Sequence, residues 1–503
     1  VYAVDSRDTD RIICQATLED NFAEDCVLVV IDAEHSEINK EFRLEDFPGV
    51  DVTEIRDLSY ITGDPYSNPY LNTVGFKQIL KLTLKNSGKE EVLKQIKNLE
   101  RLDFIYSAEP DYYFGVDDEF CDIEDEGVDT IAESEKSEAE NDINSAVLTS
   151  SVPNDPRYSE QWGLNYINAL QAWDITTGNS ASTPMSERVM VGVIDSGVAD
   201  NPDLEGNVYW DIAKDCFHGT FGKNAVTDDQ TGHGTHVAGI IGAKGNNGIG
   251  ITGVCWNVAI VPLQVTNPQL TGANYISSAI NDAINYSINR RIPIINCSFG
   301  GFDTTCNYTA AIEKYKGLIV CSVGNKSENI DTHSYVPAGL PYDNIISVAN
   351  ATNSYHLNWD SNFGTTNVDI AAPGVRIIST VTSGYTEMSG TSMAAPFVSG
   401  VAALILSVRP GLPGEHLREL ILRYADKKSE LDGKVANGAF LNAYAAVNGA
   451  LNDTVRVEFN ANGGISDYPY RYYVKGMQYK ELSGAARTGC TFVDWYLDNE
   501  KVT

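Results

Sequence analysis

Apolar and polar positions follow different patterns in successive parts of the chain, and the first part combines two periods. Residues 26–31 form an unbroken apolar run and residues 76–84 alternate, as strands do. Residues 89–99 place their apolar side chains on one face of a helix, and residues 104–110 have the pattern of a closing strand. This β-α-β order predicts a small α+β domain in residues 1–115.

A longer part, residues 153–450, alternates strand-like and helix-like stretches. Its strands, at 189–194, 292–297 and 317–323, are apolar at nearly every position rather than at every second one. Such strands are buried on both faces, which is typical of a parallel sheet covered by helices on both sides. We therefore predict an α/β domain whose functional residues lie at the carboxyl ends of its strands.

Two shorter segments have simpler patterns. Residues 116–152 are rich in Asp, Glu, Ser and Ala, a composition that cannot bury enough apolar surface to fold. We interpret them as a solvated acidic linker. Residues 454–503 begin with an alternating stretch at 455–459 and a turn at 460–464, which predicts a small β unit.

Composition limits what these parts can do. The chain has 503 residues, enough for about three domains, and its 36 basic and 69 acidic residues give a net charge of -33. Binding of nucleic acid needs clustered cations, so we expect no nucleic-acid partner. Bound cations such as calcium suit an acidic protein better.

Two further features of the composition bear on location and redox state. No stretch approaches the roughly 20 apolar residues of a membrane span. The chain opens at Val1 without Met, so we expect an upstream leader to have been removed or left out. The nine cysteines form no C-x-x-C pair and are odd in number, which favours neither a disulfide framework nor a zinc site. We interpret most of them as small core residues.

Three glycine-flanked motifs in the α/β part carry side chains that can act together. Asp195 ends an apolar strand in the motif IDSG, His233 stands in GHGTHVAG and Ser392 in SGTSMAAP. Each alone has an ordinary explanation, as a turn residue, a structural histidine or a helix cap. Together they supply a nucleophile, a base that takes its proton and an acid that orients the base.

From residue 153 to about residue 450 the sequence resembles the subtilisin-like serine proteases. The likeness rests on the chain order Asp, His, Ser and on the stretches NDP, QWGL, AWDI and VDIAAPG at 154–156, 161–164, 172–175 and 368–374. It implies a subtilisin-like parallel sheet with helices on both faces, a triad of Asp195, His233 and Ser392, and no organic cofactor. It also implies that His236 is a packed helix residue rather than the base.

The resemblance further implies the residues that contact the substrate. Asn325, which follows a buried strand, would stabilise the negative charge of acyl transfer with the backbone N–H of Ser392, assisted by Thr391. The alternative is an ordinary turn asparagine. The substrate-binding residues implied are an edge segment that pairs with an extended peptide and a residue at the mouth of a pocket: Ser298, Phe299, Gly300 and Lys326. Backbone pairing tolerates many sequences, which predicts an endopeptidase.

Lys326 leaves two interpretations of specificity open. A cation at the pocket mouth would attract Asp or Glu immediately before the cut. Alternatively, the side chain of Lys326 points into solvent and the pocket takes medium-sized apolar residues. Tyr335 would lie at the pocket floor and make it shallow.

A structural calcium site is also implied by the resemblance. The ligands would be the side chains of Asp155, Asp203 and Asn247 and the carbonyl oxygens of Lys244, Ile249 and Ile251, in the loop KGNNGIGI. Oxygen donors of this mixture suit calcium and not zinc. The alternative is a plain glycine-rich turn, and the loop is about one residue longer than in the best-known members of the family.

The two ends of the chain carry weaker resemblances. Residues 1–115 resemble the inhibitory prosegments of these proteases in their β-α-β order and in the ending YSAEPD at 106–111. Residues 454–503 resemble bacterial cell-surface β repeats at 459–464, 487–492 and 494–496. We expect the prosegment to be an intramolecular inhibitor that is cut off between Gly115 and Ser151, near 116–120. The repeat would contact the cell wall or surface.

The sequence therefore predicts a secreted or cell-surface bacterial serine endopeptidase, made as an autoprocessed zymogen that acts on proteins or peptides. Two alternatives belong to other classes. One is a surface adhesion protein whose protease domain is inactive, although the three triad residues and Asn325 are present. The other is an esterase that uses the same triad, against which the peptide-pairing segment and the prosegment argue.

Overall fold

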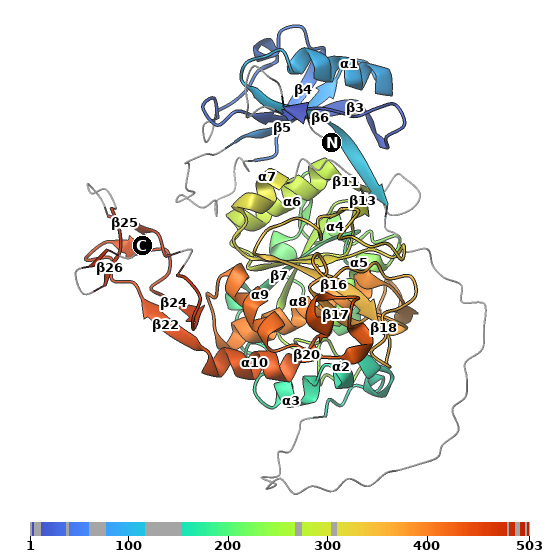
Figure 1. Cartoon of the computed structure of the whole chain (residues 1–503), viewed down its shortest axis with the longest axis vertical. Helices are drawn as coiled ribbons and strands as arrows, with labels where there is room; N and C mark the ends of the chain where they lie inside the picture. Colours follow the sequence, from blue (N-terminus) through green and yellow to red (C-terminus); the bar gives the residue numbers. More distant parts are fainter. Residues whose placement is uncertain are drawn as a thin grey trace, which may run out of the picture.

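The computed structural model describes most of the chain outside the acidic linker: residues 3–4, 12–36, 40–59, 77–115, 152–266, 274–302, 309–479, 482–487, 493–497 and 500–501. The predicted cut near 116–120 lies outside the described residues. Three units follow one another along the chain (Figure 1). We call them the N-terminal unit (residues 1–115), the central domain (153–450) and the C-terminal unit (454–503).

In its described residues, the N-terminal unit has an antiparallel sheet in the order β6-β3-β5-β4 with a helix packed on it, as its sequence pattern predicts, and a separate pair of short strands, β1 and β2. Its strands are β1 (Ala3–Val4), β2 (Ile12–Ile13), β3 (Phe22–Ile31), β4 (Val52–Asp57), β5 (Ile79–Leu84) and β6 (Ile105–Gly115), and its helix is α1 (Lys89–Leu99). The helix buries Val92, Ile96 and Leu99, whose spacing puts them on one face. The partly exposed edge strand β4 was not predicted, because its residues lack a clear apolar period.

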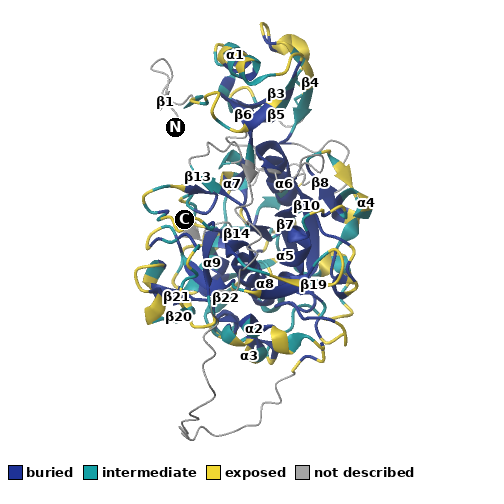
Figure 2. Ribbon diagram, turned by 90° about the vertical axis from the view of Figure 1, so that its right-hand side faces the viewer, coloured by how far each residue is buried: buried dark blue, intermediate teal, exposed yellow. Residues whose placement is uncertain are grey.

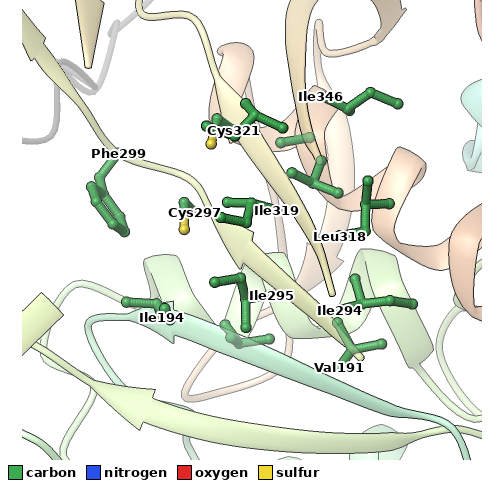
Figure 3. Packing of buried hydrophobic residues seen from close by; sticks show 14 of the residues in the cluster. Val191, Ile194, Ile294, Ile295, Cys297, Phe299, Leu318, Ile319, Cys321 and Ile346 are labelled. Atoms are coloured by element: carbon green, nitrogen blue, oxygen red, sulfur yellow. The ribbon is translucent and has the colours of Figure 1, made fainter. Parts of the chain in front are cut away.

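The central domain is built on a ten-stranded sheet in the order β20-β21-β17-β16-β14-β12-β7-β10-β8-β9. All neighbours pair in parallel except the two edge strands β9 and β20. The bounds are β7 (Met190–Asp195), β8 (Lys214–Asp215), β9 (Thr220–Phe221), β10 (Ala259–Gln264), β12 (Ile294–Cys297), β14 (Leu318–Ser322), β16 (Ile345–Ala351), β17 (Ile370–Pro373), β20 (Asp426–Lys427) and β21 (Ala439–Phe440). The apolar runs predicted as strands are β7, β12 and β14, and Figure 3 shows their side chains packed together.

Helices cover this sheet: α2 (Trp162–Tyr166), α3 (Ala169–Trp173), α4 (Lys223–Val226), α5 (His233–Gly242), α6 (Ser277–Asn289), α7 (Thr309–Lys314), α8 (Thr391–Val408), α9 (Gly414–Arg423) and α10 (Ala443–Asn452). Helices α5 and α8 are almost wholly buried (Figure 2). By length and composition, α8 could cross a membrane, with a mean hydropathy of 1.8 over 18 residues, which the sequence reading missed. In the fold, 89% of those residues are buried, so α8 is the core helix of the central domain.

Short antiparallel strands complete the central domain: β11 (Asn274–Ile276), β13 (Gly301–Phe302), β15 (Tyr335–Val336), β18 (Ile377–Thr380) and β19 (Tyr385–Met388). Strand β11 pairs with the end of β6, with Tyr275 opposite Phe114 and Ile276 opposite Tyr113. The N-terminal unit therefore continues its own sheet onto the central domain.

The C-terminal unit follows α10 directly as a set of short antiparallel strands. They are β22 (Thr454–Glu458), β23 (Ile465–Ser466), β24 (Tyr470–Val474), β25 (Ala485–Ala486), β26 (Tyr496–Leu497) and β27 (Glu500–Lys501). The backbone N–H of Val474 donates to Nδ1 of the buried His416 on α9, at 2.9 Å. This bond fastens β24 to the central domain.

The cysteines in the described part of the chain carry free thiols, as the sequence suggests. They are Cys14, Cys26, Cys216, Cys255, Cys297 and Cys321, all of them buried except Cys14. Burial raises the pKa of the Cys255 thiol to about 12, so it stays protonated at neutral pH. These side chains are small apolar components of the core.

Candidate active site

Asp195 and His233 meet at the carboxyl end of the sheet. Strand β7 ends at Asp195, helix α5 begins at His233, and His233 Nδ1 lies 2.8 Å from Asp195 Oδ1. Gly234 allows this approach, because a Cβ there would lie 2.1 Å from the carbonyl oxygen of Gly197. Both side chains are buried. The structure thus brings together the first two residues of the predicted triad.

The Asp195 carboxylate accepts several hydrogen bonds on the same oxygen, Oδ1. Besides His233, the donors are the Ser196 N–H at 2.7 Å, the Ser196 hydroxyl at 3.1 Å and the Tyr275 phenol at 2.9 Å. Its other oxygen, Oδ2, is buried without a hydrogen-bond partner among the described residues. Sequence reasoning missed Tyr275, which belongs to no catalytic motif.

A second buried carboxylate, Asp229, supports this pair. It accepts hydrogen bonds from the N–H groups of Gly232 and Thr235 at 3.0 and 2.9 Å and from the Ser196 hydroxyl at 2.8 Å. Burial, and to a lesser extent the charge of Asp195, raises the pKa of Asp229. Asp229 fixes the turn that presents His233. Its position in the sequence, four residues before His233, could have marked it as a residue of the active site.

His236 lies one turn further along α5 and is packed inside the domain. It is fully buried, and its Nε2 lies 3.1 Å from the Thr386 carbonyl oxygen. Burial and the nearby His233 lower the pKa of His236 to about 3, so the ring is neutral. This agrees with the expectation that it is a packed helix residue.

Ser392 is the second residue of α8 and lies on the same side of the sheet. Its Oγ donates to the carbonyl oxygen of Ser298 at 3.2 Å, and the Ser298 hydroxyl donates back to the Ser392 carbonyl at 2.9 Å. Gly390, at φ 150, allows the chain to enter the helix here. The predicted nucleophile and the predicted substrate segment are therefore in direct contact.

Asn325 stands just after β14 with its orientation fixed. Its Oδ1 accepts the backbone N–H of Thr391 at 2.9 Å, and the Thr391 hydroxyl accepts the N–H of Gly324 at 3.1 Å. Because the carbonyl end of the amide is held, its NH2 end is the one that can donate to a developing oxyanion. Thr391 thus holds both Asn325 and the residue before it.

The loop that carries Asn325 is shaped by a residue the sequence reasoning missed. The buried Asn362 donates to the Val323 carbonyl oxygen at 2.7 Å and accepts the N–H groups of Lys326 and Glu328 at 3.0 and 2.9 Å. A single amide therefore closes both ends of the turn. Nothing in the local sequence around Asn362 distinguishes it from a surface loop residue.

The predicted substrate segment is only partly available to a substrate. The Phe299 side chain is buried and stacks on Tyr275, so only its backbone can face a peptide. Tyr335, also buried, lies between the two glycines that flank the expected pocket: a Cβ on Gly300 would be 2.2 Å from its ring, and one on Gly324 would be 2.6 Å from it. Lys326 is exposed.

The predicted calcium ligands lie close together, but their polar atoms form hydrogen bonds with one another and with the surrounding loop. Asp155 accepts the N–H groups of Asn246 and Asn247 at 2.7 and 3.2 Å. The Asp203 oxygens accept the Asn247 amide and the Ile251 N–H, each at 2.8 Å. Burial raises the pKa of Asp203 to about 6.

Two carboxylates beside a loop of carbonyl groups suit a hard cation. Asn247 fits less well, because its amide nitrogen faces Asp203 while its oxygen accepts the Ile249 N–H at 2.9 Å. Its amide would have to turn over to bind a cation. Lys244 contributes its N–H to the Asp203 carbonyl at 2.7 Å, and its ammonium donates to Asn257 instead. The described residues contain no cluster of three acidic, histidine or cysteine side chains arranged for a metal.

Comparison with known proteins agrees with this geometry. The family model described as the subtilase family matches residues 186–445. Thermitase of Thermoactinomyces vulgaris is 35% identical over 303 residues, which cover 59% of this chain and 99% of that protein. The extracellular protease of Xanthomonas campestris is 30% identical, over 60% of this chain and 57% of that protein.

Other matches cover less of their own length or superimpose less closely. Subtilisin-like protease 2 of Plasmodium falciparum is 32% identical over 59% of this chain, which spans only 23% of that protein. A solved protease of Pseudoalteromonas arctica has a TM-score of 0.49 and 28% identity, over 60% of this chain and all of that one. Because the family model matches half of the chain and the match to thermitase covers 99% of that protein, the chain belongs to the subtilase family of subtilisin-like serine proteinases.

Proposed function

We propose that this protein is a secreted serine endopeptidase that hydrolyses peptide bonds in proteins through Asp195, His233 and Ser392. The observation that carries the proposal is the 2.8 Å bond between His233 and Asp195, beside an Asn325 whose carbonyl end is tied to the residue preceding Ser392. This arrangement supplies a base, a group that orients it and donors for an oxyanion.

We assign these side chains the roles of an acyl-transfer triad. Ser392 Oγ attacks the scissile carbonyl carbon while His233 takes its proton, and Asp195 stabilises the resulting imidazolium. The oxyanion accepts hydrogen bonds from the Asn325 amide and the Ser392 N–H. His233 then protonates the leaving amine, and water, deprotonated by His233, releases the acyl group from Ser392. The Ser392 hydroxyl, which donates to Ser298, must turn toward His233 when substrate binds.

Labelling with a fluorophosphonate probe tests this assignment. The probe should phosphonylate Ser392 in the matured protein, and Ser392→Ala should remove both the label and the digestion of casein. Ser399→Ala, which changes a buried serine of the same helix, is the matched control. An unlabelled, inactive wild-type protein would support the alternative of an inactive scaffold, and rapid turnover of esters without casein digestion would support an esterase.

We also propose that residues 1–115 are an inhibitory prosegment that the enzyme cuts off itself. The pairing of β6 with β11 supports this, because β11 is an edge strand of the kind that receives extended peptides. Polar contacts hold the two parts together: Arg56 pairs with Asp282 at 2.8 Å, and Lys81 donates to the Ser278 hydroxyl at 3.2 Å. The first cut would fall between Gly115 and Ser151.

Autoprocessing has a direct test. Purified Ser392→Ala protein should keep its full length, whereas the wild type should separate into a prosegment and a shorter enzyme whose N-terminal sequence gives the cut. If the Ser392→Ala chain matured unaided, self-cleavage would be excluded.

For specificity, we propose a shallow pocket for the side chain before the cut. The Tyr335 ring occupies the space between Gly300 and Gly324, which favours small or medium-sized side chains over large aromatic ones. Lys326 is the alternative determinant, since an exposed cation at the mouth would favour Asp or Glu.

Calcium, location and surface contact complete the proposal. Asp155 and Asp203 would hold a structural calcium ion with the loop from Lys244 to Ile251, where the ion would offset the charge of the buried Asp203. Secretion by a bacterium is supported by the relatives described as extracellular proteases, from Xanthomonas campestris and Dichelobacter nodosus. The C-terminal unit would place the enzyme at a cell wall or surface.

A further inference from the structure

We propose that Tyr275 is a positioning residue of this active site, whose phenol holds Asp195 beside His233. The inference rests on the proposed function, because the orientation of Asp195 matters only if His233 acts as a base. Tyr275 lies outside the three catalytic motifs, 80 residues from Asp195 in the sequence, yet donates to its Oδ1 at 2.9 Å.

The sheet order explains how Tyr275 reaches this position. Strand β7 lies between β12 and β10, and the last residue of β10, Gln264, is level with Asp195. The chain returns through β11, where Tyr275 forms a bridge with Thr266, just past the end of β10. The tyrosine therefore approaches Asp195 from the β10 side.

The ring is held from the opposite side as well. Phe299, which follows β12, stacks on Tyr275 with ring centroids 5.1 Å apart and planes at 28°. Tyr275 is fully buried, and its hydroxyl lies 3.5 Å from His233 Nδ1. Both neighbours of β7 thus contribute to fixing one phenol, which leaves it little rotational freedom.

The charge around Asp195 suggests what the phenol does. A buried carboxylate needs donors, and the hydroxyl provides one from a side chain that cannot swing away. By sharing the negative charge, it also weakens the hold of Asp195 on the imidazolium. His233 then becomes neutral, and able to act as a base, at a lower pH. The other titratable groups facing this pair are Asp229, through Ser196, and the neutral His236.

The backbone of Tyr275 gives the same residue a second contact. It stands opposite Phe114 in the pairing of β11 with β6, the edge that would bind an extended peptide. Occupation of this edge and orientation of the catalytic carboxylate therefore depend on one residue.

The test compares Tyr275→Phe with Tyr286→Phe, each of which removes one buried hydroxyl. Tyr286 is on the following helix and donates to the Ile212 carbonyl at 2.9 Å, away from the triad. For Tyr275→Phe we expect kcat to fall about 10-fold with KM nearly unchanged. The acidic limb of kcat/KM should move to higher pH. Tyr286→Phe should leave both unchanged.

A second variant distinguishes the proposed role from misfolding. A second measurement follows His233 directly and does not depend on enzymatic activity. Replacement of Tyr275 by 3-fluorotyrosine keeps the ring and strengthens the donor, so the acidic limb should move to lower pH. In the Ser392→Ala background, nuclear magnetic resonance should show the His233 ring titrating at higher pH in Tyr275→Phe than in the parent.

The outcomes separate cleanly. Shifts of opposite sign for phenylalanine and fluorotyrosine support the role of Tyr275. An unshifted limb and an unshifted His233 titration overturn it, as does an equal loss of kcat in Tyr286→Phe. A wild type without proteolysis would instead count against the proposed function, while the His233 titration would still decide about Tyr275.

Discussion

Asp111 of the N-terminal unit accepts the backbone N–H of Ser278, in the first turn of α6, at 2.8 Å. The Asp111 side chain is fully buried and also pairs with Lys81 at 2.8 Å. The contact places a carboxylate at the positive end of a helix of the central domain, where the first four N–H groups have no acceptor within the helix. With the ion pair of Arg56 and Asp282, it is one of the charged contacts that link the two parts.

This contact predicts how strongly the prosegment inhibits. Asp111→Asn should raise the inhibition constant of residues 1–115 toward the matured enzyme by about 100-fold, because it removes the negative charge at the start of α6 and leaves the partly buried Lys81 without its counter-charge. Glu45→Gln, at an exposed position of the same unit, is the control. Equal inhibition by both variants would show that the strand pairing alone carries the affinity.

Calcium should stabilise the central domain. Binding to the folded state alone adds about 3 kcal/mol at a free concentration 100 times the dissociation constant. We expect the melting temperature of Ser392→Ala protein to fall by several degrees in chelator. Asp203→Asn should abolish the difference, while Asp200→Asn, at an exposed carboxylate nearby, should preserve it. A melting temperature indifferent to chelator in the parent would rule the site out.

His236 should make the domain sensitive to acid. Its pKa, lowered to about 3 by burial, lies below the unfolded value near 6.5, so protons bind the unfolded state preferentially as the pH falls through that interval. The titration of His236 therefore leaves the free energy of unfolding unchanged above pH 6.5 and lowers it below that pH. His236→Gln, which keeps a donor for Thr386, should recover about 2–3 kcal/mol of the stability lost between pH 7 and pH 4.5. Urea unfolding of the Ser392→Ala protein, with and without His236→Gln, measures this free energy at each pH. The same dependence of stability on pH in both proteins would contradict the prediction.

Tyr335 should set the size of side chain accepted before the cut. Tyr335→Gly should raise kcat/KM for peptides with Phe at that position at least about 10-fold relative to peptides with Ala. Tyr342→Gly removes a partly buried ring from the following loop and is the control. An unchanged ratio of Phe to Ala would mean that Tyr335 does not line the pocket.

Lys326 should act on specificity through its charge. Peptides that differ only in Glu or Gln before the cut should show a several-fold preference for Glu, which Lys326→Glu should reverse. The preference should shrink at high salt, because the side chain is exposed. Equal cleavage of both peptides by wild type and variant would leave the pocket shape as the determinant.

The catalytic motifs could be predicted because each packs its chemistry into a short stretch. Asp195 closes an apolar strand, and the glycines on either side of His233 have structural reasons: Gly232 adopts a positive φ of 71°, and a Cβ on Gly234 would lie 2.1 Å from the Gly197 carbonyl oxygen. The strand pattern was equally informative, since β7, β12 and β14 are apolar on both faces.

The supporting contacts could not be predicted in the same way. Tyr275 meets Asp195 only because β11 returns beside β10, and a sequence pattern does not give the order of strands. Asn362 reaches the Asn325 loop from 36 residues away. Phe299 was predicted to pair with substrate through its backbone, and no sequence pattern indicates that its side chain completes the packing around Tyr275.

The buried thiols have a consequence for where this fold can assemble. Cys297 and Cys321 lie opposite each other on β12 and β14, and both remain free thiols inside the core. The described part of the fold thus closes by packing alone and requires neither an oxidant nor a disulfide isomerase. Reductants that inactivate disulfide-dependent secreted enzymes should therefore leave the packing of β12 against β14 intact.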